Sequence, residues 1–172
     1  MERDEFANAL KNVKLQGFVW PDPEDAGDLR IVKNVIEAGC HIIGVEKEIG
    51  EPQFTYSIGL YLNYLQPEIM IVEMEPRRAA DAINRIASHL KSGGSLEVGV
   101  TYDQFDDRVP FRFRELQMEK HTDELGFAIW FYCSRSGRLK FPVYQAMWPD
   151  RSGRFPSDSE CDAGVMKAQT LR

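Results

Sequence analysis

The order of the periodic segments constrains the fold of this chain more than any other feature of its sequence. Apolar residues at helical spacing come first, over residues 29–38, and two runs rich in β-branched and aromatic residues follow at 40–47 and 53–60. An apolar run of strand length at 68–74, a long amphipathic pattern and then mainly strand patterns complete the order. Because strands and helices do not alternate regularly, the sequence predicts an α+β domain and not a doubly wound parallel sheet.

Local signals define the predicted helices and the first hairpin. Asp28 is suited to cap the helix at 29–38, and Gly39 can adopt the left-handed conformation that ends it. The predicted buried face of this helix carries Leu29, Val32, Val35 and Ile36. The turn-forming stretch 49–52 predicts that the runs on either side of it form an antiparallel pair. Pro76 occupies the favoured first position of a second helix, which Gly93 and Gly94 end.

The second half of the chain predicts mainly strands. Residues 109–116 alternate apolar and polar side chains, so their arginines are expected to face out, and this strand is a candidate sheet edge. A short helix is expected at 118–125. The segment 127–133, FAIWFYC, is so apolar that it predicts a strand covered on both faces, and 141–148 predicts another strand. The expected fold is one α+β domain, a mainly antiparallel sheet flanked by two or three helices.

Length and charge indicate how the chain is organised. Its 172 residues suit one domain, which we place at 29–156, between an N-terminal acidic arm at 1–28 and a C-terminal tail at 157–172 with little periodicity. The net charge is −6, and the arm alone holds seven acidic residues against three basic ones. Residues 135–154 form a basic island, with five basic residues and the single acid Asp150.

Several classes of function are disfavoured by composition and spacing. The acidic balance argues against nonspecific nucleic-acid binding, and no apolar run is long enough to cross a membrane, so we expect a cytoplasmic protein. The three cysteines and three histidines lack the spacing of metal sites, so no metal is expected. Walker and dinucleotide-binding glycine loops do not occur. No cofactor is therefore predicted from motifs, and the oligomeric state is open.

Two segments supply candidate ligand-binding residues. Ser57 superficially resembles the serine of a nucleophile elbow, but Thr55 replaces the required glycine, which favours a structural role, and Tyr56 can offer a phenol or pack its ring. In the second segment Trp148 precedes Asp150, Arg151 and Arg154 at a strand end, an arrangement that can stack a planar group and bind an anion. The competing interpretation is that Trp148 closes the core and the arginines are solvated.

The same segments carry a family resemblance. Tyr56 to Leu60, Pro67-Glu68, Gln145 and the run from Trp148 to Pro156 resemble the bacterial family catalogued as domain of unknown function 4262, over roughly residues 32–156. The chain departs from that family at Ser157, where a tryptophan commonly follows the last Phe-Pro. The resemblance implies a bacterial origin and no particular activity.

Two hypotheses for function follow. The first is a non-enzymatic binding protein whose partner is another protein, for instance an immunity-type inhibitor that blocks a toxin encoded beside it, because an acidic inhibitor can be steered to a basic target. The second is a small enzyme or ligand sensor that binds a planar anion such as a flavin or nucleotide between the Tyr56 and Trp148 segments. We favour the first, because each candidate nucleophile or base lacks a recognisable partner in the sequence. The second hypothesis requires those two segments to meet in space.

Overall fold

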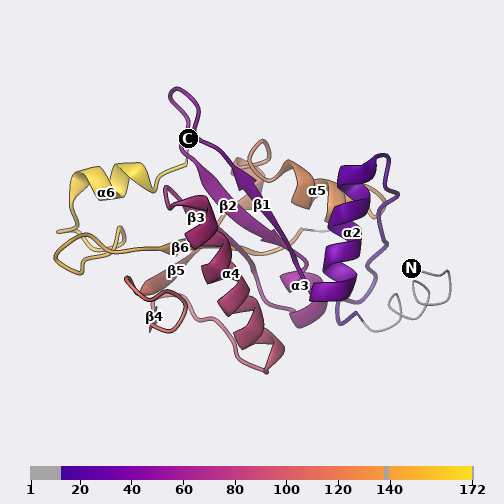
Figure 1. Ribbon diagram of the computed structural model, residues 1–172, viewed down its shortest axis with the longest axis horizontal. Coiled ribbons are helices and arrows are strands. Elements are labelled where there is room, and N and C mark those ends of the chain that lie inside the picture. Colours follow the sequence, from indigo (N-terminus) through magenta and orange to yellow (C-terminus); the bar gives the residue numbers. More distant parts are fainter. Residues whose placement is uncertain (1–12, 138–139, 172) are drawn as a thin grey trace.

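A six-stranded mixed sheet forms the centre of the molecule, with the strand order β1-β2-β3-β6-β5-β4 (Figure 1). The computed structural model describes residues 13–137 and 140–171. Only β3 and β6 pair in parallel, and the other neighbouring strands are antiparallel. The strands are β1 (His41–Val45), β2 (Phe54–Ile58), β3 (Glu68–Val72), β4 (Thr101–Tyr102), β5 (Phe111–Leu116) and β6 (Val143–Met147). The predicted single α+β domain with a mainly antiparallel sheet is confirmed.

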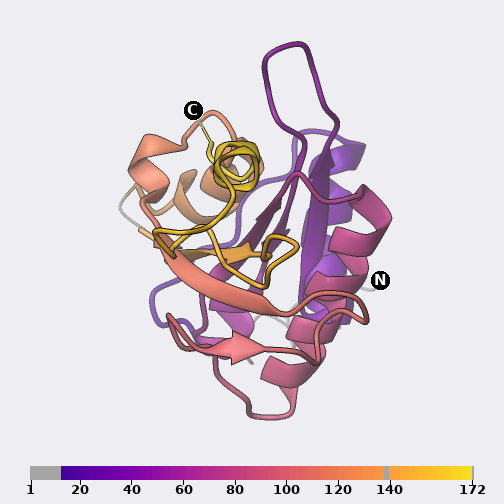
Figure 2. The ribbon, with the colours of Figure 1, turned by 90° about the vertical axis from the view of Figure 1, so that its left-hand side faces the viewer.

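The predicted first hairpin is also confirmed. β1 and β2 pair antiparallel in a register that sets His41 opposite Ile58 and Val45 opposite Phe54. Beyond the paired strands the chain continues to a tight turn, in which the Glu51 backbone N–H donates to the Glu48 carbonyl oxygen at 3.1 Å. This hairpin projects from the sheet (Figure 2), and Ile49 at its tip is fully exposed.

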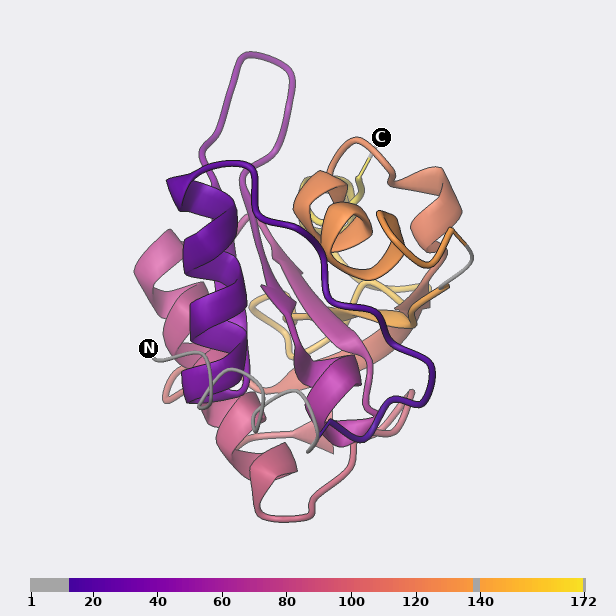
Figure 3. The same cartoon turned by 90° about the vertical axis from the view of Figure 1, so that its right-hand side faces the viewer.

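Helices cover both faces of the sheet, and each face has its own core. The α5-side core joins α2 (Ala26–Ala38) and α5 (Gly126–Cys133) to the side chains of Phe54, Tyr56 and Ile58. In Figure 3, α2 is seen to the left and α5 to the right of β1 and β2, and both helices contribute to this one core. The α4-side core joins α4 (Pro76–Lys91) to Ile69, Ile71, Phe111 and Phe113 on the opposite face. Two shorter helices, α3 (Leu60–Tyr64) and α6 (Ala163–Ala168), follow β2 and precede the C-terminus.

The prediction of a strand at 127–133 is wrong, because this segment forms the helix α5. Its buried residues, together with Leu125 just before it, follow helical spacing: Leu125, Ala128, Phe131 and Tyr132. The side chains between them are also apolar, so the sequence shows no alternation that separates a buried helix from a buried strand. The outward side of α5 therefore presents apolar side chains, with Phe127 50% exposed.

Three further expectations need correction. The first helix begins at Ala26 and is capped by Asp25, whose side chain accepts the Asp28 N–H. Its buried face includes Ile31, whereas Leu29, which was expected there, is exposed. β5 is not a sheet edge, because it lies between β6 and β4. Only residues 118–120 of the expected 118–125 helix are helical, as a 3-10 turn.

The two ends of the chain take part in the packing. Leu15 is buried in the α5-side core, and Gln169, which follows α6, has no exposed surface. The first twelve residues of the predicted acidic arm, and Arg138 of the basic island, lie outside the described residues. The predicted helix ends are confirmed at Gly39, which has a φ of 88°, and at Pro76, the first residue of α4.

Candidate functional site

Ser57, a predicted site residue, belongs to a buried hydrogen-bond network around Glu68. The Ser57 hydroxyl donates to Glu68 Oε2 at 2.6 Å and accepts the backbone N–H of Ile69 at 2.9 Å. Glu68 Oε1 accepts the backbone N–H groups of Gly59 and Tyr61 at 2.8 and 3.1 Å, and the hydroxyl of Tyr132 donates to the same oxygen. Both carboxyl oxygens are therefore engaged in holding the turn from β2 into α3.

Burial controls the ionisation of this network. Glu68 has no exposed surface, and its desolvation raises the pKa of its carboxyl group. The hydrogen bonds from Ser57, Tyr132 and the backbone lower that pKa, but burial has the larger effect. Burial, followed by the charge of Glu68, also raises the pKa of the Tyr132 hydroxyl. Cys40 lies close enough that burial and the Glu68 charge raise the pKa of its thiol to about 12. Each of these groups is a poor nucleophile in this environment, which indicates a structural role for Ser57 and Glu68.

Asp150 holds the loop after β6 in shape. Its Oδ1 accepts the N–H groups of Ser152 and Arg154, and its Oδ2 accepts the N–H of Asp162, at 2.8, 3.0 and 2.9 Å. The predicted turn is confirmed by the Gly153 N–H, which donates to the Asp150 carbonyl oxygen at 3.0 Å. The same backbone donors lower the pKa of the Asp150 carboxyl. The carboxylate is thus committed to local backbone groups.

The other predicted residues of this loop also have partners or solvent around them. The Trp148 indole N–H donates to the Val72 carbonyl oxygen at 3.0 Å, and the ring packs against the α4-side core. The Arg154 guanidinium pairs with Glu160 at 3.2 Å, and Arg151 is exposed.

The structure does not bring the two predicted segments into one concavity. Tyr56 is buried in the α5-side core, whereas Trp148 packs against the α4-side core on the other face of the sheet. Tyr56 pairs with Met70 of β3, and Met70 pairs with Gln145 of β6, so these three side chains lie on one face of the sheet. Trp148 comes three positions after Gln145, just beyond β6, and successive side chains of extended backbone alternate between faces, which places Trp148 on the other face.

A mainly apolar cleft between α2 and α5 includes one predicted residue, Tyr56. Its volume is about 450 Å³, and Tyr56 lies at its floor beside Val45 and Phe54. Phe127 and Trp130 line it from α5. Burial raises the pKa of the Tyr56 hydroxyl, and the backbone N–H of Phe127 acts in the opposite direction, so the phenol lies near the first turn of α5. We refer to this site as the α2–α5 cleft.

Carboxylates surround the opening of the α2–α5 cleft. Asp28 contributes from α2, and Asp123 and Glu124 from the residues before α5. A second cavity of about 350 Å³ adjoins it along the hairpin and adds Glu46, Glu48 and Glu51. The described residues that line the two cavities include six acids and neither lysine nor arginine. The site can therefore accept an apolar group that carries positive charge.

Most residues of this cleft were not predicted from the sequence. Phe127 and Trp130 were assigned to a strand covered on both faces, Asp28 was assigned as a helix cap, and the acidic residues within 46–51 and 123–124 were given no functional role. Because residues 125–133 are all apolar or glycine, no periodicity in the sequence identified a helix there, or apolar residues on its outer side.

Neither a metal centre nor a membrane span is evident in residues 13–137 and 140–171. Within these ranges, no three His, Cys, Asp or Glu side chains are placed to hold a metal ion. None of the helices there is both long and apolar enough to cross a bilayer.

A family model described as a domain of unknown function, DUF4262, matches residues 34–162. The chain belongs to the DUF4262 family. No curated protein and no solved structure matches it. The DUF4262 match contains the whole sheet, the Glu68 network and the aromatic residues of the cleft, whereas Asp28 and α6 lie outside it.

Proposed function

We propose that this DUF4262 protein is a non-enzymatic binding protein that recognises a basic protein partner through the α2–α5 cleft. The specific form that we propose is an immunity-type inhibitor of a toxin encoded beside its gene. The observation that carries the proposal is the combination of exposed aromatic surface on α5 with a rim of carboxylates.

The apolar surface of the cleft supplies a driving force for association. Phe127 is 50% exposed and Val45 36% exposed, and both lie beside the partly buried Trp130. Burial of apolar surface is worth roughly 25 cal/mol per Å², and aromatic residues are enriched among those that dominate binding energy. A partner that covers these side chains removes their apolar surface from water, and this burial contributes to its binding free energy.

The charge of the molecule favours one class of partner. The full chain has a net charge of −6, and six acids line the cleft and the cavity beside it. Complementary charge accelerates encounter and excludes partners of the same sign. A basic protein is consequently favoured over an acidic one.

The polar groups of the Glu68 network and of the loop after β6 favour a binding role over a catalytic one. The Ser57 hydroxyl and both oxygens of Glu68 and Asp150 are hydrogen-bonded within the fold. Catalytic groups need reach to a substrate, and these groups face internal partners.

The test uses the purified full chain and the purified products of the neighbouring genes. Binding is measured by isothermal titration calorimetry at low and high salt. We expect one product to bind, about tenfold more weakly to Phe127→Ser than to the unaltered protein, because the substitution removes an aromatic contact at the centre of the cleft. Asp123→Asn combined with Glu46→Gln should weaken binding mainly at low salt.

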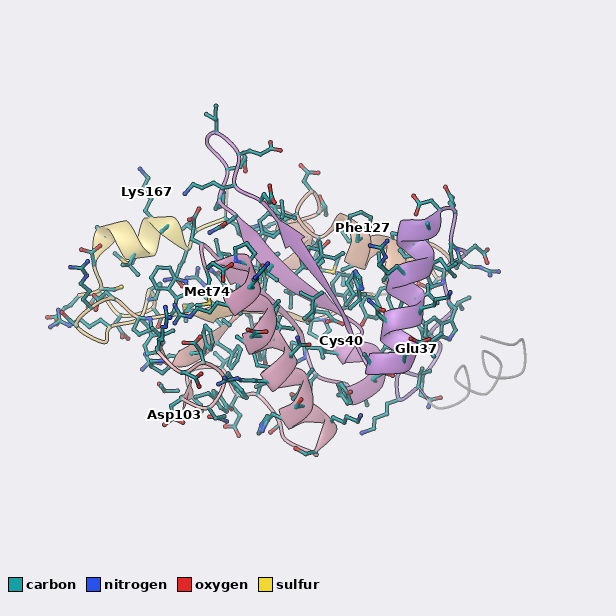
Figure 4. The ribbon with its side chains drawn as sticks, in the orientation of Figure 1. Glu37, Cys40, Met74, Asp103, Phe127 and Lys167 are labelled. Carbon is teal, nitrogen blue, oxygen red and sulfur yellow. The ribbon has the colours of Figure 1, made fainter. Side chains whose placement is uncertain are left out.

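Matched control variants lie elsewhere on the surface. Val98→Ser alters an apolar side chain that is also 50% exposed, and Asp103→Asn removes an exposed charge beside β4. Figure 4 shows that Asp103 and Phe127 lie in well-separated parts of the molecule. Both controls should bind within about twofold of the unaltered protein. Failure of every neighbouring product to bind, with unchanged competition between cells after deletion of the gene pair, would contradict the proposal.

A further inference from the structure

The α2–α5 cleft continues into a groove along the projecting hairpin. The cleft and its neighbouring cavity share Val45, Phe54, Asp123 and Glu124. The two cavities therefore adjoin one another, and together they extend from Tyr56 in the cleft to Glu48 and Glu51 near the hairpin tip. We call these two adjoining cavities the hairpin groove.

The hairpin groove changes character along its length. The Tyr56 end is apolar and aromatic, lined also by Phe127 and Trp130. The other end adds three glutamates, Glu46, Glu48 and Glu51, none of which forms an ion pair with a basic side chain of the described residues. The one lysine on this hairpin, Lys47, pairs instead with Glu73 at 2.9 Å. It lines a third cavity beside α6, whose lining also includes Glu51 and Lys167. The groove therefore presents an apolar site and an unpaired negative site in a fixed order.

The length of the groove sets the spacing of a ligand. From Tyr56 to Glu51 the chain advances five residues in a largely extended form, which corresponds to about 17 Å at roughly 3.3 Å per residue. An extended segment of a partner would need about five residues to cover the same distance.

We propose that the hairpin groove binds one linear segment of a partner protein, in which a large aromatic side chain is joined, within about five residues, to at least two lysine or arginine residues. The aromatic side chain enters the α2–α5 cleft between Phe127 and Trp130, and the basic side chains lie against Glu46, Glu48 and Glu51. This inference rests on the proposed function and specifies the partner's recognition element. Apolar burial at one end and charge complementarity at the other together fix the direction of the segment.

The test measures fluorescence anisotropy of a dye-labelled nine-residue peptide in which one tryptophan is followed by lysines three and five positions later, separated by serines. We expect saturable binding to the full chain that weakens as salt rises. Phe127→Ser should weaken it about tenfold, and Glu48→Gln with Glu51→Gln about threefold or more at low salt. Val98→Ser and Asp103→Asn are the controls, with affinities expected to stay within about twofold.

Three altered peptides define what would overturn the inference. Replacement of the tryptophan by serine, replacement of the lysines by glutamine, and movement of the tryptophan to the position between the lysines should each weaken binding. Equal affinity for the shuffled peptide, or equal affinity for lysine amide alone, would show that the groove does not read a linear segment and would overturn the inference. So would absence of binding to any peptide.

The full-length partner separates this inference from the proposed function. If a neighbouring gene product binds with sensitivity to Phe127→Ser while no peptide binds, the linear-segment inference is wrong and the proposed function stands. If neither the peptides nor any neighbouring product binds, both are wrong.

Discussion

At the scale of single residues, Glu68 is the buried acceptor that organises the turn from β2 into α3. Its carboxyl group accepts from backbone donors of the turn into α3, and from the hydroxyls of Ser57 and Tyr132. Gly59 in that turn has a φ of 114°, and a Cβ there would lie 2.9 Å from Val35 and 3.0 Å from the Gly39 carbonyl oxygen. The turn therefore requires both a glycine and a buried acceptor.

The Glu68 network predicts a large difference between two substitutions. Glu68→Ala leaves several buried donors without an acceptor and should lower the free energy of unfolding by about 3 kcal/mol or more. Glu68→Gln keeps one acceptor oxygen and most of the shape, so its cost should be smaller. Urea denaturation monitored by circular dichroism measures both. Equal stability of Glu68→Ala and the unaltered protein would contradict this role.

Glu68 also predicts a pH dependence. A carboxyl group whose pKa is raised by folding favours the folded state while protonated, and that contribution falls as pH rises from its ordinary value of 4.5 through the raised pKa. The stability advantage of the unaltered protein over Glu68→Gln should therefore be greatest near pH 4 and decline toward higher pH. Denaturation midpoints of the two proteins, compared across that range, check the sign. A growing advantage toward higher pH would show the opposite direction of the pKa shift.

At the scale of elements, α5 connects the fold to the proposed function. One side of this helix packs into the α5-side core, and the other side supplies Phe127 and Trp130 to the cleft. A helix that is apolar on every side is ordinarily buried all round. Its incomplete burial here is what makes the cleft a candidate for recognition.

The geometry of α5 predicts unequal effects for two phenylalanines. Phe131 has no exposed surface, so Phe131→Ala should cost about 3–5 kcal/mol, whereas Phe127→Ala should change stability by less than about 1 kcal/mol. Positions four apart share one face in a helix as in a strand, so the expected difference reports the burial of each side chain. Phe131 packs in the α5-side core, whereas Phe127, in the first turn of α5, lines the cleft. Chemical denaturation of the two variants measures both costs, and a similar large loss for both would contradict the exposure of Phe127.

At the scale of the whole molecule, the C-terminal segment is hydrogen-bonded to β6 and to the residue that follows it. The Gln169 side-chain amide accepts the Trp148 N–H at 3.0 Å and donates to the Trp148 carbonyl oxygen at 2.8 Å. Its backbone carbonyl oxygen accepts from the Gln145 amide at 2.6 Å. Residues after the DUF4262 match thus complete hydrogen bonds of residues within it.

These hydrogen bonds predict that Gln169 is important for stability. Gln169→Ala should lower the free energy of unfolding by about 1–3 kcal/mol, because it leaves the Trp148 backbone groups without their side-chain partner. Thr170→Ala, at the exposed neighbouring position, is the control and should have a smaller effect. Thermal and urea denaturation give the comparison. A decrease in the free energy of unfolding for Gln169→Ala no larger than for the control would contradict this stabilising role.

The sequence by itself determined the elements whose signals are local. Alternation at 109–116, the period of the helix that starts at Pro76, and the turn between the first two strands each depend on neighbours along the chain, and the structure has all three. The motif residues around Tyr56, Glu68 and Trp148 likewise sufficed to indicate the DUF4262 family. Such patterns can be recognised without knowledge of the fold, because the periodicity of a helix or strand depends on residues that are close together in the sequence.

Tertiary structure alone decided where functional chemistry can occur. An apolar segment such as 126–133 is compatible with helix or strand, and only its packing on β2 selects the helix. Asp28, Val45, Tyr56 and Phe127 are distant in the sequence, and they line one cleft because the α2 and α5 helices lie over the same strands. Trp148 and Tyr56 are separated for the converse reason, since the sheet itself lies between them.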